Sequence, residues 1–167
     1  MPGPGGAPTP GSETNPRERA TVMQGDRAKA YRPIPPDLRR AALEAGLRAY
    51  ARGEYFEAHE LLEPAWMGTS DLAERALYQG LIKLAAGYVH AVRGNPIGFA
   101  RNLRGARGHL ETSLRLNPEI ALEAGVDIPN LVLGIEERLT AVAAVADDLA
   151  VGRQPLIALL PAPPRIR

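Results

Sequence analysis

The chain has 167 residues, of which 45% are hydrophobic and only 5% aromatic, and its formal net charge is +1. That length suits one domain plus a tail, and a core of Leu, Ala, Val and Ile suits helices packed on helices. The small net charge gives no global attraction to nucleic acid, and the absence of Cys excludes thiolate zinc sites, thiol nucleophiles and disulfides. No apolar run spans a bilayer and no signal peptide begins the chain. We therefore expect a cytoplasmic protein whose partner is neither a membrane nor a nucleic acid.

Residues 1–30 are rich in Pro, Gly, Thr and charged side chains, and they show almost no apolar periodicity. Such a segment cannot bury enough surface to offset the entropy lost on ordering, so we predict a disordered N-terminal tail. Met23 lies inside it. We hypothesise that Met23 is the true start, because nothing before it has a structural pattern; the intact mass of the native protein tests this.

Residues 31–153 are predicted to form an all-α bundle of about five helices. The first helix ends at Gly53 and the second covers residues 55–66. Asp71, followed three residues later by an acidic side chain, opens a third helix over about Leu72–Arg93. The breadth of apolar positions in the third helix predicts a central element that several neighbours contact.

Asn95 followed by Pro opens the fourth helix, and Gly94 ends the third. After a short helical turn, Asp127 opens a fifth helix that ends at Gly152. The remainder, residues 154–167, is interrupted by four prolines and is predicted to be irregular. The simplest architecture is two antiparallel helical hairpins plus a C-terminal helix.

Residues 55–66 are the only stretch in which a His, several carboxylates and the sole Trp lie together. Read as a helix, steps of four, three and four place these residues on one inward face: Tyr55, His59, Leu62 and Trp66. Glu63 lies one turn after His59, within side-chain reach. A metal-ligand pair, an acid/base pair and a buried structural hydrogen bond would all have this pattern. Pro64 removes a backbone donor, so we expect the helix to kink or stop there.

The motif His59-x-x-x-Glu63-x-x-Trp66 resembles the hallmark of a family known as domain of unknown function 309, found in bacteria and archaea. Residues 77–82, His90 and residues 93–95 are also similar to that family. The resemblance covers about the middle half of the chain. It implies a metal site at the motif and no established activity.

A metal site needs about three or four protein ligands, and His59 and Glu63 supply two. The candidates for a third are Glu60, Glu57 and His90. His90 shares a helical stripe with Gln79 and Lys83. A cation beside a metal ion is unfavourable, so that stripe can instead face water.

We predict a small binding protein that holds a divalent metal ion or another small ligand in a pocket made of His59, Glu63, Trp66, Glu60, Gln79 and His90. The alternative is a tetratricopeptide-like interaction scaffold, in which the pair of His59 and Glu63 is only structural. A weaker alternative is a metal-assisted hydrolase. The absence of a glycine-rich phosphate loop, a zinc-protease pattern and a nucleophile elbow favours binding over catalysis. A homo-oligomer remains open.

Overall fold

The structure is a computed structural model that describes residues 21–24, 27–30, 32–145 and 156–167. The chain divides into two compact units, Met1–Tyr31 and Arg32–Arg167. In the first unit, strands β1 (Thr21–Gln24) and β2 (Arg27–Ala30) pair antiparallel, with Thr21 opposite Ala30. Both strands lie within the predicted disordered tail, 1–30, and the rest of that tail lies outside the described residues. The tail and the alternative start at Met23 therefore stay predictions.

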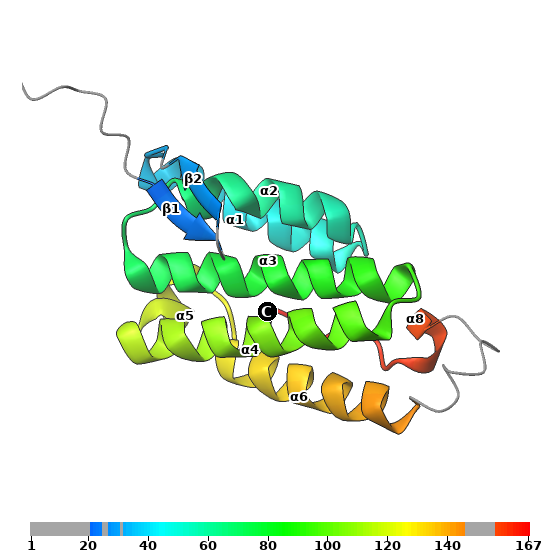
Figure 1. Cartoon of the computed structure of the whole chain (residues 1–167). Coiled ribbons are helices and arrows are strands. Elements are labelled where there is room, and N and C mark those ends of the chain that lie inside the picture. The colour runs from blue at the N-terminus through cyan, green and yellow to red at the C-terminus, as the bar shows by residue number, and fades with distance from the viewer. Residues whose placement is uncertain (1–20, 25–26, 31, 146–155) are drawn as a thin grey trace, which may run out of the picture. The chain divides into compact units, whose positions relative to one another are not determined.

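In the second unit, the regular elements of the described residues are seven helices (Figure 1). They are α1 (Pro36–Ala51), α2 (Tyr55–Met67), α3 (Leu72–Val92), α4 (Pro96–Leu116), α5 (Ile120–Ala124), α6 (Ile128–Ala144) and α8 (Leu156–Leu159). This arrangement confirms the predicted all-α bundle of about five main helices. The predicted end of the fifth helix, Gly152, lies outside the described residues.

Local signals fix several of the helix ends. The side chains of Asp71, Asn95 and Asp127 each accept a hydrogen bond from the backbone N–H three residues later, which confirms the predicted N-caps. Gly53 and Gly94 follow α1 and α3 with φ angles of 79° and 69°. This left-handed conformation strains any residue with a Cβ atom, so glycine suits both helix ends.

The helices pack as two antiparallel hairpins, α1 with α2 and α3 with α4, and α6 lies against α4 (Figure 1). Helix α2 also packs on α3, which explains why α3 is buried on more than one side, as its sequence predicted. The largest fully buried side chains include Trp66, Tyr88, Phe99, Leu103, Leu131 and Ile135. No helix of the described residues is long and apolar enough to cross a membrane.

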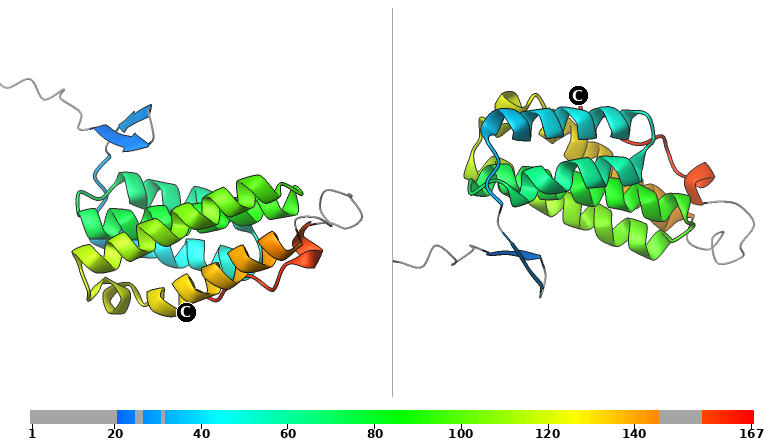
Figure 2. Two further views of the ribbon diagram at one scale, coloured as in Figure 1. Left: turned by 60° about the horizontal axis from the view of Figure 1, so that its bottom comes forward. Right: turned by 90° about the horizontal axis from the view of Figure 1, so that it is seen from above.

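Residues 160–167, which we call the C-terminal strap, run between α1 and α6 (Figure 2). Alternate strap carbonyls accept hydrogen bonds: Ala162 from Arg138 (2.6 and 3.0 Å), Pro164 from the Tyr50 hydroxyl (3.2 Å) and Ile166 from the Asp127 N–H (3.0 Å). The side chains of Leu160, Pro164 and Ile166 are buried. Within the segment predicted as irregular, 154–167, only α8 is regular among the described residues. The strap is therefore an anchored part of the bundle.

Candidate functional site

One turn of α2 brings together His59, Glu60 and Glu63, which we call the His59 cluster. One ligating atom from each of these side chains lies within 4.8 Å of the others. Nδ1 of His59 lies 3.0 Å from Oε1 of Glu60. His59 and Glu63 are half-buried and Glu60 is exposed, so the cluster lies at the edge of the buried face of α2. It combines one imidazole with two carboxylates within the reach of a single ion.

The buried face of α2 is rotated from the predicted one. Leu62 and Trp66 are buried as expected, but the side chain of His59 keeps 28% of its exposure and does not point fully inward. The sequence pattern is based on large side chains, whereas two of the residues that α2 buries are small. The residues that α2 buries are Ala58, Leu62, Ala65 and Trp66. His59 lies at the rim of this buried face.

Helix α2 continues through Pro64 to Met67, so of the two predicted effects of Pro64, a kink or a stop, the stop is wrong. Pro64 is exposed, and so is Glu60, whose carbonyl loses its backbone donor to the proline ring. On an exposed face, water can satisfy that carbonyl, which lowers the cost of a proline inside a helix. The continuous helix keeps Glu63 one turn from His59, as the motif required.

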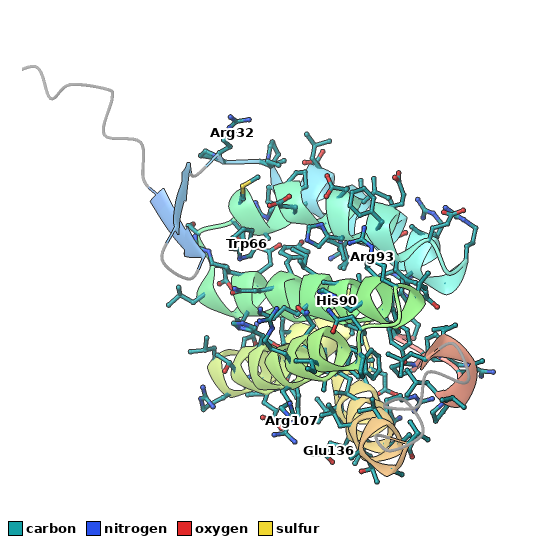
Figure 3. All side chains as sticks on the ribbon, turned by 45° about the vertical axis from the view of Figure 1, so that its right-hand side comes forward. Arg32, Trp66, His90, Arg93, Arg107 and Glu136 are labelled. Carbon is teal, nitrogen blue, oxygen red and sulfur yellow. The ribbon has the colours of Figure 1, made fainter. Side chains whose placement is uncertain are left out.

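The other predicted pocket residues lie elsewhere on the bundle. Trp66 is 2% exposed and lies between α2 and α3 (Figure 3). His90 lies farther along α3, where its Nδ1 atom is 3.2 Å from the Asn95 amide nitrogen at the start of α4. A Cβ added at Gly98 would lie only 2.5 Å from Nδ1 of His90, so the imidazole packs closely on α4. Gln79 is half-buried on α3. Of the candidates for a third ligand, the structure brings Glu60 to His59 and Glu63, and His90 is outside the cluster.

A second polar cluster, which the sequence did not reveal, surrounds Glu74 on α3; we call it the Glu74 network. Oε1 of Glu74 accepts hydrogen bonds from Arg39 Nε (3.0 Å) and from the Tyr78 hydroxyl (2.9 Å), and Oε2 accepts one from the Thr69 hydroxyl. The side chains of Arg39 and Glu74 are only 16% and 20% exposed. Burial raises the pKa of Glu74, but hydrogen bonds from Arg39, Thr69 and Tyr78 outweigh it and hold this pKa below its usual value.

The Glu74 network joins the first turns of α1, the loop before α3 and α3 itself. The sequence interpretation treated the acidic residue after Asp71 as half of a capping box. The Asp71 half of that box is present, because its carboxylate accepts the Glu74 N–H at 2.7 Å. The Glu74 side chain instead bonds to an arginine 35 residues earlier in the chain. Three donors therefore satisfy this carboxylate within the protein.

The segment that contains the His59 cluster matches a known protein family. Residues 43–102 match the family described as "Domain of unknown function (DUF309)". We call the matching residues the DUF309 segment. It runs from α1 into α4 and contains all six residues predicted for the site, which confirms the resemblance seen in the motif. The C-terminal strap and α6 lie outside the DUF309 segment. No curated protein and no solved structure matches the chain.

Proposed function

We propose that this protein binds a divalent metal ion through His59, Glu60 and Glu63. The observation that carries the proposal is the convergence of one imidazole nitrogen and two carboxylate oxygens within 4.8 Å on a single turn of α2. Imidazole and carboxylate are both common ligands of Zn²⁺ and of neighbouring divalent ions. Three protein ligands would leave a coordination position for water or for a small ligand.

The setting of the cluster determines the expected strength of binding. The side chain of Glu60 is 51% exposed and that of His59 is 28% exposed. Metal binding must therefore order both side chains and remove part of their hydration. Helix α2 supplies all three ligands, and its backbone is fixed by burial of Leu62 and Trp66. A rigid helix therefore presents the ligands, while their exposure keeps the site accessible to exchange. We expect reversible binding rather than a permanently held structural ion.

Calorimetric titration of the full chain with Zn²⁺, supported by metal analysis, tests the proposal. We expect His59→Gln and Glu63→Gln each to weaken Zn²⁺ binding at least about tenfold, because each removes one ligand of three. Glu57→Gln is the matched control, since Glu57 lies on the same helix but outside the cluster; its affinity should change less than about twofold. Absence of Zn²⁺ binding, or equal affinity in all four proteins, would refute the proposal.

A second candidate function, an interaction scaffold, is favoured by a different observation. Phe56 and Val92 are 62% and 61% exposed, and both line one pocket between the start of α2 and the end of α3. Large exposed apolar side chains that share a concave surface are typical of protein contact sites. In this function the pair of His59 and Glu63 would only support the helix.

The variant His59→Gln distinguishes the metal-binding function from the interaction scaffold. If His59→Gln lowers the melting temperature while neither protein binds Zn²⁺, the scaffold gains support. Sedimentation of the wild type and of Phe56→Ser then checks self-association, which would decrease in the variant if the Phe56 surface mediates it. Zn²⁺ binding that depends on His59, with unchanged sedimentation, would favour the metal-binding function.

A further inference from the structure

A pocket of about 450 Å³ lies between the C-terminal strap and the first helical hairpin, and none of its lining residues belongs to the His59 cluster. Leu47, Tyr50 and Ala51 of α1 form one wall, Tyr55 of α2 closes one end, and residues 163–167 of the strap form the other wall. Pockets of this size, lined by apolar and aromatic side chains with a few polar groups, are typical of small-molecule sites.

Tyr50 and Tyr55 give this pocket an aromatic surface, which we call its aromatic floor. The ring centroids of Tyr50 and Tyr55 lie 5.5 Å apart with an interplanar angle of 68°, and Tyr55 lies 5.1 Å from Tyr88 at 33°. Tyr88 in turn makes an edge contact with Phe99 in the core, at 5.4 Å. Because buried Tyr88 and Phe99 support the two pocket tyrosines, the aromatic surface is pre-formed. A flat aromatic ligand could stack on it without a rearrangement of the protein.

The strap wall is fixed in position as well. The Tyr50 hydroxyl donates to the Pro164 carbonyl at 3.2 Å, and Arg138 donates twice to the Ala162 carbonyl. Ile166 is buried, and its carbonyl accepts the Asp127 N–H. Both walls of the pocket are therefore held by hydrogen bonds and burial.

Two polar groups at the pocket have no partner within the described part of the chain. The guanidinium of Arg165 forms no ion pair or hydrogen bond there, and neither does the hydroxyl of half-buried Tyr55. Arg167, by contrast, pairs with Glu44 at 3.5 Å. The positive charge of Arg165 would bind an anionic group, and the Tyr55 hydroxyl can donate a hydrogen bond to it. Burial raises the pKa of Tyr55, which keeps this hydroxyl protonated at neutral pH.

We propose that this pocket, the strap pocket, binds a small aromatic carboxylate, whose ring lies on Tyr50 and Tyr55 and whose carboxylate faces Arg165. The aromatic floor selects the ring, and the guanidinium of Arg165, which has no partner among the described residues, selects the negative charge. The site is independent of the His59 cluster, because the two share no lining residue. Loss of metal binding would leave it intact.

Calorimetric titration of the full chain with 2-naphthoate, compared with neutral 2-naphthalenemethanol, tests the proposal. We expect 2-naphthoate to bind the wild type more tightly than the alcohol. Arg165→Gln should weaken 2-naphthoate binding about tenfold while leaving the weaker binding of the alcohol unchanged, since a hydrogen bond to a charged group contributes about 1.5–3 kcal/mol, or roughly tenfold and more in affinity. Arg101→Gln is the matched control, because Arg101 is exposed on α4 and does not line the strap pocket.

A second variant locates the binding without relying on charge. Ala51→Leu fills the pocket from its exposed rim, so the fold should be retained, as circular dichroism would verify. This variant should bind neither compound. Equal affinity for the acid and the alcohol in the wild type, unchanged 2-naphthoate binding in Arg165→Gln or Ala51→Leu, or no binding of 2-naphthoate at millimolar concentration would each overturn the proposal.

Discussion

The Glu74 network and the His59 cluster both contain glutamate carboxylates, yet the groups around those carboxylates differ. In the Glu74 network, three hydrogen-bond donors from separate segments converge on one carboxylate. In the His59 cluster, one helix brings two carboxylates and an imidazole toward each other, and thereby gathers ligating atoms at an exposed rim. Hydrogen-bond donors that surround a carboxylate stabilise its charge and the fold. Two neighbouring carboxylates instead concentrate negative charge, which favours the binding of a cation. The comparison predicts that one cluster governs stability and the other governs metal response.

The largest effect is expected from removing the acceptor at the centre of the Glu74 network. Glu74→Ala should lower the free energy of unfolding by about 2–4 kcal/mol, because it removes the carboxylate that accepts from Nε of the largely buried Arg39 and from two hydroxyls. Glu60→Ala, the control from the His59 cluster, should change it by less than about 0.5 kcal/mol, since the Glu60 side chain is 51% exposed. Urea titration, followed by circular dichroism, measures both. Similar losses in the two variants would remove the distinction between the clusters.

For the response to Zn²⁺ we expect the reverse: substitution in the His59 cluster should have the larger effect, and substitution in the Glu74 network the smaller one. A ligand that binds only the folded state at a hundred times its dissociation constant stabilises that state by about 2.7 kcal/mol. We therefore expect Zn²⁺ to raise the melting temperature of the wild type and of Glu74→Ala, and to raise that of Glu63→Gln by at most about half as much, because the affinity of this variant is at least about tenfold lower. Thermal denaturation with Zn²⁺ and with EDTA checks this. An equal zinc-induced rise in the wild type and in Glu63→Gln would place the ion elsewhere.

The local part of this fold was predictable and the long-range part was not. Asp71, Asn95 and Asp127 could be assigned as N-caps because a cap depends on residues only three positions apart. The all-α bundle followed from the apolar periodicity between those caps. The Glu74 network was missed because its arginine lies 35 residues away, and nothing in the sequence fixes how the start of α1 meets α3.

The same limit explains the partial success at the candidate site. His59 and Glu63 could be paired from their spacing, because one continuous helix sets their separation. The addition of His90 required the register between α2 and α3, which the spacing of residues along one helix does not give. Ala58 and Ala65 carry no strong signal in a pattern based on large apolar side chains, so the predicted inward face was rotated. His90 packs on Gly98 of α4 instead.

Acid should weaken the Glu74 network by a smaller amount than the substitution of Glu74 does. The pKa of Glu74 in the folded protein lies below its ordinary value of 4.5, so its stabilisation is complete above that pH. As the pH falls through the lowered pKa, the carboxylate is protonated and this stabilisation is lost. We expect Glu74→Gln to be less stable than the wild type at pH 7 and to lose less stability between about pH 5 and 2. Parallel curves of stability against pH for the two proteins would contradict the assignment.

The smallest effect isolates a single donor to Glu74. Tyr78→Phe removes the hydroxyl that donates to Oε1 at 2.9 Å and keeps the buried ring, so it should cost about 1 kcal/mol of unfolding free energy. The matched control is Tyr55→Phe, whose hydroxyl has no hydrogen-bond partner among the described residues and whose loss should be close to neutral. Urea titration of both variants gives the difference. In the Glu74→Gln background, Tyr78→Phe should cost less than in the wild type, because a neutral amide oxygen accepts a weaker hydrogen bond than a carboxylate. An equal cost in the two backgrounds would mean that the Tyr78 hydroxyl contributes to stability independently of the Glu74 carboxylate.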